Sequence, residues 1–106
     1  MKTTIQFLDA LKEKLGVESD YALAKRLGLQ LSTVSGYRTG RRFFDDDAAL
    51  TVALALDVHP FNVIAAVNAE RAKTPEQRAR WSGVTEKFSA SFNSLLLGRG
   101  PHVASL

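Results

Sequence analysis

Three arginines, Arg38, Arg41 and Arg42, fall within five residues, next to Gly36 and Gly40. Guanidinium groups at this density suit a polyanion such as the backbone of a nucleic acid. Charge along the chain points the same way: residues 1–44 hold eight Lys/Arg and four Asp/Glu, a balance of +4, whereas the rest hold six and seven, a balance of −1. A solvated basic loop explains the charge equally well. Nucleic-acid binding therefore depends on the elements that position these arginines.

Catalytic chemistry has no comparable group of residues. The chain has two His and no Cys, and it has neither a nucleophile with a base nor a Gly-rich phosphate loop. The consecutive carboxylates of residues 45–47 point in different directions and suit a helix start better than a metal site. His59 and His102 lack further ligands at metal spacing. We predict a protein that is not an enzyme, with no catalytic residue, metal, cofactor or small-molecule substrate.

The arginines follow a predicted pair of short helices at residues 19–27 and 31–37, joined by a tight turn. Ala24 is small where the helices cross, Gly28 suits the positive φ of the turn, and Val34 faces Leu23. The outward side of the second helix then carries only short groups, which would let it lie deep in a DNA major groove. These residues are Ser32, Thr33, Ser35 and Gly36.

The rest of the chain is predicted to be helical, which makes the fold all-α. Ile5, Leu8, Leu11 and Leu15, with Phe7, mark one face of a first helix that Thr3 or Thr4 caps and Gly16 ends. Further helices are expected at 45–56, from Pro60 to residue 71 or 73, and from Thr74 onward, where Pro75 and Gln77 complete an N-terminal signal. Gly83 weakens the prediction that this last helix is continuous.

The paired helices and the arginines after them resemble the Cro/cI-type (XRE) repressor family. The residues that carry the resemblance are Leu23-Ala24-Lys25-Arg26-Leu27-Gly28-Leu29 and Ser32-Thr33-Val34-Ser35-Gly36-Tyr37-Arg38-Thr39-Gly40-Arg41-Arg42. The resemblance covers residues 1–64 and implies a lambda-repressor-like five-helix DNA-binding domain. The segment 69–73, followed by Trp81, resembles less-characterised phage-related proteins.

The same resemblance assigns roles to the site residues. It places Gln30, Leu31, Ser32, Ser35 and Gly36 nearest the base edges, and makes Thr33, Tyr37, Arg38, Arg41 and Arg42 candidates for phosphate contacts. The helical phase of Tyr37 matches that of Val34, which favours a partly buried wedge over a base reader. The chain departs from the family at Asp20 and Tyr21, where Gln or Thr often contacts a phosphate, and at Gly36, which replaces a long polar reader.

An apolar stripe follows the predicted domain. It consists of Trp81, Val84, Phe88, Phe92 and Leu95. These residues suit an ordinary core or a dimer interface equally well. We expect a helix-turn-helix DNA-binding domain at residues 1–66, a helical extension at 67–97 that promotes dimerisation, and a disordered tail at 98–106.

Together these features predict a transcriptional regulator that binds double-stranded DNA. We expect a phage or prophage repressor that acts at a promoter as a homodimer, with recognition helices about 34 Å apart. An antitoxin or phage accessory protein that acts through protein-protein contacts is the alternative. Without a leader or a membrane span in the sequence, we expect a cytoplasmic, nucleoid-associated protein.

Overall fold

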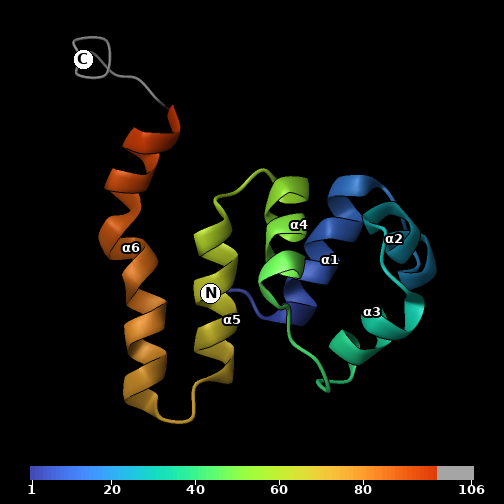
Figure 1. Cartoon of the computed structure of the whole chain (residues 1–106), viewed down its shortest axis with the longest axis horizontal. Coiled ribbons are helices and arrows are strands. Elements are labelled where there is room, and N and C mark those ends of the chain that lie inside the picture. Colours follow the sequence, from blue (N-terminus) through green and yellow to red (C-terminus); the bar gives the residue numbers. More distant parts are fainter. Residues whose placement is uncertain (98–106) are drawn as a thin grey trace.

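The computed structural model describes residues 1–97, and the side chains of residues 1–87. The described part contains six α-helices and no strand, which confirms the all-α prediction. The helices are α1 (Thr4–Leu15), α2 (Asp20–Leu27), α3 (Leu31–Arg38), α4 (Asp46–Leu56), α5 (Pro60–Arg71) and α6 (Pro75–Leu97). In Figure 1, α6 lies along α5 at one side of the molecule, and α2 and α3 lie at the other. No described helix is long and apolar enough to cross a membrane.

Local side-chain caps explain where the first helices begin and end. The hydroxyl of Thr3 accepts from the Gln6 amide at 3.3 Å, and the Gln6 side chain accepts from the Thr3 amide at 2.9 Å. The Ser19 hydroxyl accepts from the Ala22 amide at the start of α2, and the Asp45 carboxylate accepts from the Ala48 amide at the start of α4. Gly28 ends α2 with a φ of 71°, a left-handed conformation that glycine adopts without strain. The predicted ends of these helices are therefore confirmed.

The core lies between α1, α2, α3, α4 and α5. Its largest fully buried apolar side chains are Leu8, Leu11, Leu23, Val34, Val52 and Val63. The prediction for Ile5 is wrong, because this side chain is 40% exposed and Thr4 is buried instead. Both the amide and the hydroxyl of Thr4 donate to Glu70 of α5, at 2.9 and 2.8 Å. This anchor turns Thr4 inward, so Ile5, the next residue around the helix, faces solvent.

The C-terminal part forms one hairpin of helices. The predicted domain boundary between residues 66 and 67 falls inside α5, which continues to Arg71. After a short turn, the Thr74 hydroxyl accepts from the Gln77 amide at 3.1 Å, and α6 then runs through Gly83 without interruption. The predicted disordered tail, residues 98–106, lies outside the described residues.

Candidate nucleic-acid interface

The α2 and α3 helices are the predicted pair of short helices joined by a tight turn. Leu23 and Ala24 of α2 and Val34 of α3 are buried, with at most 2% of each side chain exposed. The Leu29 amide donates to the Ala24 carbonyl at 2.9 Å and closes the turn. Because the buried contacts lie on one side of α3, the opposite side is held toward solvent in a defined orientation.

The start of α3 carries the exposed residues of the predicted interface. Gln30, Leu31 and Ser32 are exposed, and Thr33 and Ser35 are half-buried. No side chain caps the first amides of α3, where Gln30 is the N-cap residue. An uncapped helix start carries partial positive charge that attracts anions. The N-terminal end of α3 therefore exposes uncapped amides, one apolar side chain (Leu31) and the polar side chains of Gln30 and Ser32.

Arg38 does not belong to this exposed surface, contrary to its predicted phosphate contact. Its guanidinium donates to both carboxylate oxygens of Asp20 on α2, at 2.9 and 3.0 Å, and to Asp9 on α1 at 2.7 Å. Only 23% of the Arg38 side chain is exposed. Because carboxylates from two other helices already hold this cation, Arg38 fastens α3 to the domain. We call Asp9, Asp20 and Arg38 the ion cluster.

The ion cluster changes the acidity of Asp20. Hydrogen bonds from Arg38 hold the pKa of the Asp20 carboxyl below its ordinary value, although partial burial acts in the opposite direction. Lys12 adds a further salt bridge to Asp20 at 3.6 Å. The unusual Asp20 at the start of α2 was a visible signal of this cluster. Nothing in the sequence marked Asp9 as a member of the ion cluster, because only the packing of α1 brings it near Arg38.

Tyr37 and Gly36 also differ from their predicted roles. Tyr37 is only 5% exposed, and its ring meets the ring of Phe44 edge-on at a centroid distance of 4.8 Å. Burial raises the pKa of the Tyr37 phenol. Tyr37 is therefore a core residue and not a phosphate contact, because it shares the inward phase of Val34. Gly36 is buried as well, beneath the side chain of Arg42, so it does not lie open toward a base edge.

Arg41 and Arg42 remain exposed, in the loop between α3 and α4. The Arg41 guanidinium donates to the Thr39 hydroxyl at 3.1 Å, and this hydroxyl donates to the Gly36 carbonyl at 3.2 Å. The Arg42 amide also donates to the Gly36 carbonyl, at 3.1 Å. The loop is thus folded back on the end of α3, and both guanidinium groups lie beside the helix.

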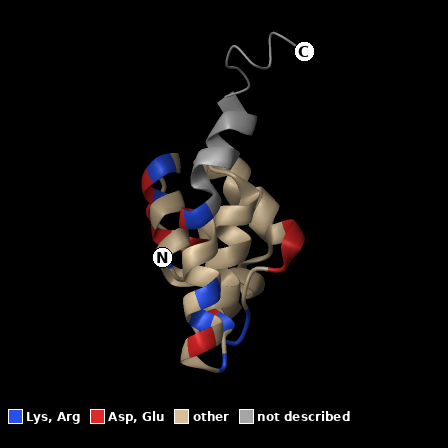
Figure 2. Cartoon of the chain, turned by 90° about the vertical axis from the view of Figure 1, so that its left-hand side faces the viewer, with Lys and Arg blue, Asp and Glu red and all other residues tan. Residues whose placement is uncertain are grey.

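Positive charge is not confined to the segment after α3. Exposed cations also lie from the end of α5 to the start of α6, at Arg71, Lys73, Arg78 and Arg80, with Glu76 among them. Figure 2 shows Lys and Arg interspersed with Asp and Glu on this side of the molecule. The candidate interface is placed at α3 and the loop that follows it because there the cations adjoin a helix that exposes short polar side chains.

Two predicted dimerisation residues have contacts within the chain. The Trp81 ring lies against Phe61 of α5 at a centroid distance of 6.5 Å, and Trp81 and Val84 are both half-buried. For Trp81 this favours the ordinary-core alternative, because packing against α5 covers part of its ring. The side chains of Phe88, Phe92 and Leu95 lie outside the described residues.

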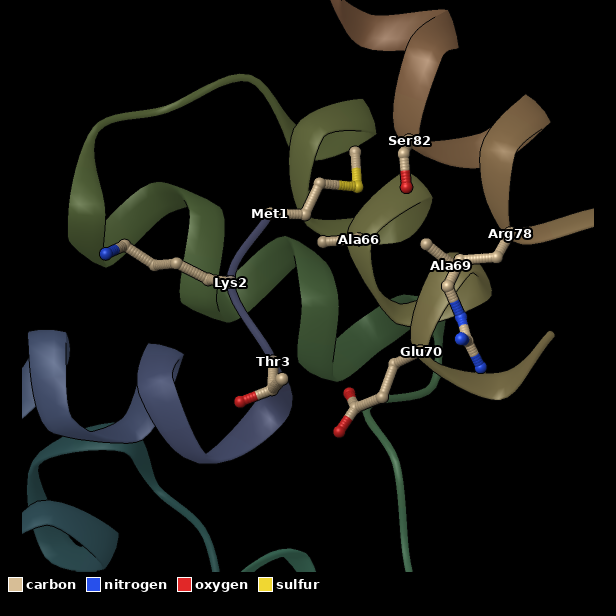
Figure 3. A pocket seen from close by; sticks show the side chains of 8 residues that line it. All are labelled: Met1, Lys2, Thr3, Ala66, Ala69, Glu70, Arg78 and Ser82. Atoms are coloured by element: carbon tan, nitrogen blue, oxygen red, sulfur yellow. The ribbon is translucent and has the colours of Figure 1, made fainter. Parts of the chain in front are cut away.

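A hollow between the N-terminal segment, α5 and α6 has a volume of about 360 Å³. Figure 3 shows Glu70 and Arg78 at its edge, with the Glu70 carboxylate directed toward the start of α1. Because Thr4 already donates twice to Glu70, this carboxylate joins α1 to α5 and is not a free ligand group. Among the residues described, no cluster of His, Cys, Asp and Glu could hold a metal ion.

Comparison with known proteins places the chain in a family. A family model described as a phage related protein matches residues 64–102. The uncharacterized protein Gp-c of Pseudoalteromonas phage PM2 is 34% identical over 84 residues, which cover 74% of this chain and 90% of the phage protein. The chain belongs to this phage-related family. The match to Gp-c is longer than residues 64–102 and so includes helices that precede them.

The phage-related family agrees with the resemblance seen at residues 69–73 and Trp81. No solved structure matches the chain. The resemblance to Cro/cI-type repressors, and the lambda-repressor-like arrangement that it implies, therefore remain predictions.

Proposed function

We propose that this phage-related protein is a sequence-specific DNA-binding transcriptional regulator, a repressor with a Cro/cI-type, lambda-repressor-like domain. The proposal rests on the solvent-facing side of α3, which carries short polar side chains and is followed at once by exposed Arg41 and Arg42. A helix with this surface fits the width of a major groove, and the arginines add attraction for the phosphate backbone.

The fixed position of α3 supports this role. Val34 is fully buried, and Arg38 joins the end of α3 to α1 and α2 through the ion cluster. A recognition helix held from both sides loses little conformational freedom when it enters a groove. The free energy of DNA binding is therefore not reduced by an entropic cost of ordering the helix.

Repression follows from occupancy of a promoter. With no enzyme site identified, the protein would act by blocking RNA polymerase from the DNA that it covers. A homodimer would place two copies of α3 in successive major grooves, about 34 Å apart. Such a protein would work in the bacterial cytoplasm, bound to the nucleoid.

An electrophoretic shift tests DNA binding directly. Full-length protein is mixed with the DNA upstream of its gene and with a scrambled competitor at two salt concentrations. We expect selective retention of the upstream DNA that weakens as salt rises. The absence of retention, with a helical circular dichroism spectrum, would contradict the proposal.

Two variants then separate the roles within the interface. Arg41→Gln removes a cation beside α3 and should weaken binding to every sequence, with the slope of log affinity against log salt reduced by about one unit. Ser32→Ala leaves the charge unchanged and should alter the preferred sequence while the slope stays constant. If both variants change the same property, α3 is not the recognition helix.

The oligomeric state of the full chain has its own measurement. Light scattering after gel filtration should give the mass of a dimer at the concentrations where DNA is bound, and a footprint should contain two related half-sites. A monomer that protects one undivided site would remove the dimer from the proposal and leave DNA binding intact.

A second candidate function, binding to another protein, is favoured by apolar residues on the outer side of α4 and in the turn that follows it. Leu50, Leu54 and Val58 recur at four-residue steps and are 45, 72 and 40% exposed. An apolar stripe of this kind is typical of protein contacts, as in an antitoxin. Coexpression with the product of a co-transcribed neighbouring gene tests this: a complex with the wild type that Leu54→Gln abolishes would support it, and its absence would count against it.

A further inference from the structure

Gly36 occupies a position where glycine is costly for the helix. It lies inside α3, and glycine is the poorest helix former among the ordinary residues other than proline. No left-handed conformation explains it, because Gly36 is not among the residues with positive φ. A local contact must therefore account for the missing side chain.

That contact is with Arg42. A Cβ atom built on Gly36 would lie 2.8 Å from Cδ of Arg42, 3.1 Å from its Cγ and 3.4 Å from its Nε. Real Cβ atoms essentially never lie at the first of these distances from another heavy atom, so a side chain at position 36 would make the Arg42 side chain shift away. The absence of a Cβ atom is what allows the stem of Arg42 to lie directly on the backbone of α3.

This contact between Arg42 and Gly36 lies on the solvent-facing side of α3. Ser35 and Gly36 lie three and four residues after Ser32, which places all three on one face of the helix. Val34 and Tyr37 define the opposite, buried face. Arg42 therefore covers Gly36 from the side of the helix that would enter a groove.

The guanidinium of Arg42 is also available. The side chain is exposed, and within residues 1–87 neither an ion pair nor a hydrogen bond engages its guanidinium. Arg38 is held by two carboxylates, and Arg41 donates to Thr39. Of these three arginines, Arg42 is the one whose stem lies on the α3 backbone while its guanidinium has no hydrogen bond or ion pair within residues 1–87.

We infer that Arg42, seated on Gly36, reads a guanine in the major groove and so supplies the long polar side chain that α3 itself lacks. This inference rests on the proposed DNA-binding function and replaces the phosphate contact predicted for Arg42. A guanidinium donates two parallel hydrogen bonds to O6 and N7 of guanine, which is the commonest specific contact in protein-DNA complexes. Lysine keeps the charge but cannot present this planar pair of donors.

Selection from a duplex library with a randomised centre tests the inference. Full-length wild type, Arg42→Lys, Gly36→Ala and Arg80→Lys are each used to retain DNA, and the retained sequences are compared. In the wild-type motif we expect one G·C pair per half-site whose preference falls about tenfold or more in Arg42→Lys. Gly36→Ala should relax the same pair, because its methyl group displaces Arg42. The matched control, Arg80→Lys, changes an exposed arginine of α6 outside the proposed interface and should keep the wild-type motif.

The outcomes separate this inference from the proposed function. If the wild type enriches no sequence, the proposed function itself has failed. If the wild type enriches a motif that Arg42→Lys or a folded Gly36→Ala enriches equally, only the inference is overturned. Thermal melting accompanies the selection, and Arg42→Lys, which leaves the helix backbone unchanged, decides the result if Gly36→Ala does not fold.

Discussion

Arg38 and Arg42 lie four residues apart, yet they belong to two different regions of the molecule. Arg38 belongs to the ion cluster, where Asp9 and Asp20 hold its guanidinium against α1 and α2. Arg42 lies exposed in the loop after α3, with its stem on Gly36. Both arginines lie at or just after the end of α3. Contacts with side chains of other helices therefore decide whether such an arginine stabilises the fold or stays exposed to a partner.

The physical reason is desolvation. A guanidinium that is only 23% exposed has lost much of its water, so carboxylate partners must replace the lost hydrogen bonds. An exposed guanidinium keeps its water until a ligand displaces it, and it contributes little to folding in the meantime. Substitutions at the two arginines should therefore affect different measurements.

The largest expected effect is that of Arg38→Ala on stability. Removal of this cation leaves Asp20 and Asp9 without their main partner, and we expect a loss of about 2 kcal/mol, between the values typical of exposed and buried pairs. For a chain of this size the melting temperature should fall by about 10 °C. Differential scanning calorimetry measures this fall in melting temperature.

Arg42→Ala is the matched control for this change. Its melting temperature should remain within about 3 °C of the wild type, because substitutions at exposed sites change stability little. Equal destabilisation by both substitutions would erase the distinction between the ion cluster and the exposed loop.

A second, smaller effect concerns pH. Hydrogen bonds from Arg38 hold the pKa of folded Asp20 below the ordinary value of 3.8, so the ion cluster contributes stability that is fully present above that value. As the pH falls through the lowered pKa, Asp20 takes up a proton in the folded state and the contribution is lost. Urea unfolding at pH 6 and pH 3 should show a larger loss of stability for the wild type than for Asp20→Asn. An identical loss in both proteins would mean that Asp20 is not coupled to Arg38.

The smallest expected effect belongs to the exposed region. Thr39→Val removes the hydroxyl that accepts from Arg41 at 3.1 Å, and an exposed hydrogen bond of this kind contributes little. We expect DNA affinity to fall about twofold to threefold, measured by fluorescence anisotropy, with the melting temperature unchanged. A larger drop in melting temperature than in affinity would assign Thr39 to the fold and not to the interface.

Much of the helical framework could be predicted because its signals are local. Thr3, Ser19 and Asp45 cap the helices that follow them, and Gly28 ends α2, through bonds that span only a few residues. The exposed position of Ser32 also followed from the phase of α3, whereas Gln30 and Leu31 were assigned by the family resemblance. The continuity of α6 through Gly83 was less certain, since glycine weakens a helix that packing can still retain.

The amino-acid sequence by itself determined the six helices, the turn between α2 and α3, and the basic segment after them, because caps, periodicity and charge act over short stretches of chain. Only the tertiary structure decided the roles of the site residues. Asp9 lies 29 residues before Arg38, and the two meet because α1 packs against α3. Likewise, Arg42 covers Gly36 because the loop folds back on its own helix. The surroundings of a charged side chain depend on contacts between elements, and these are absent from any local pattern.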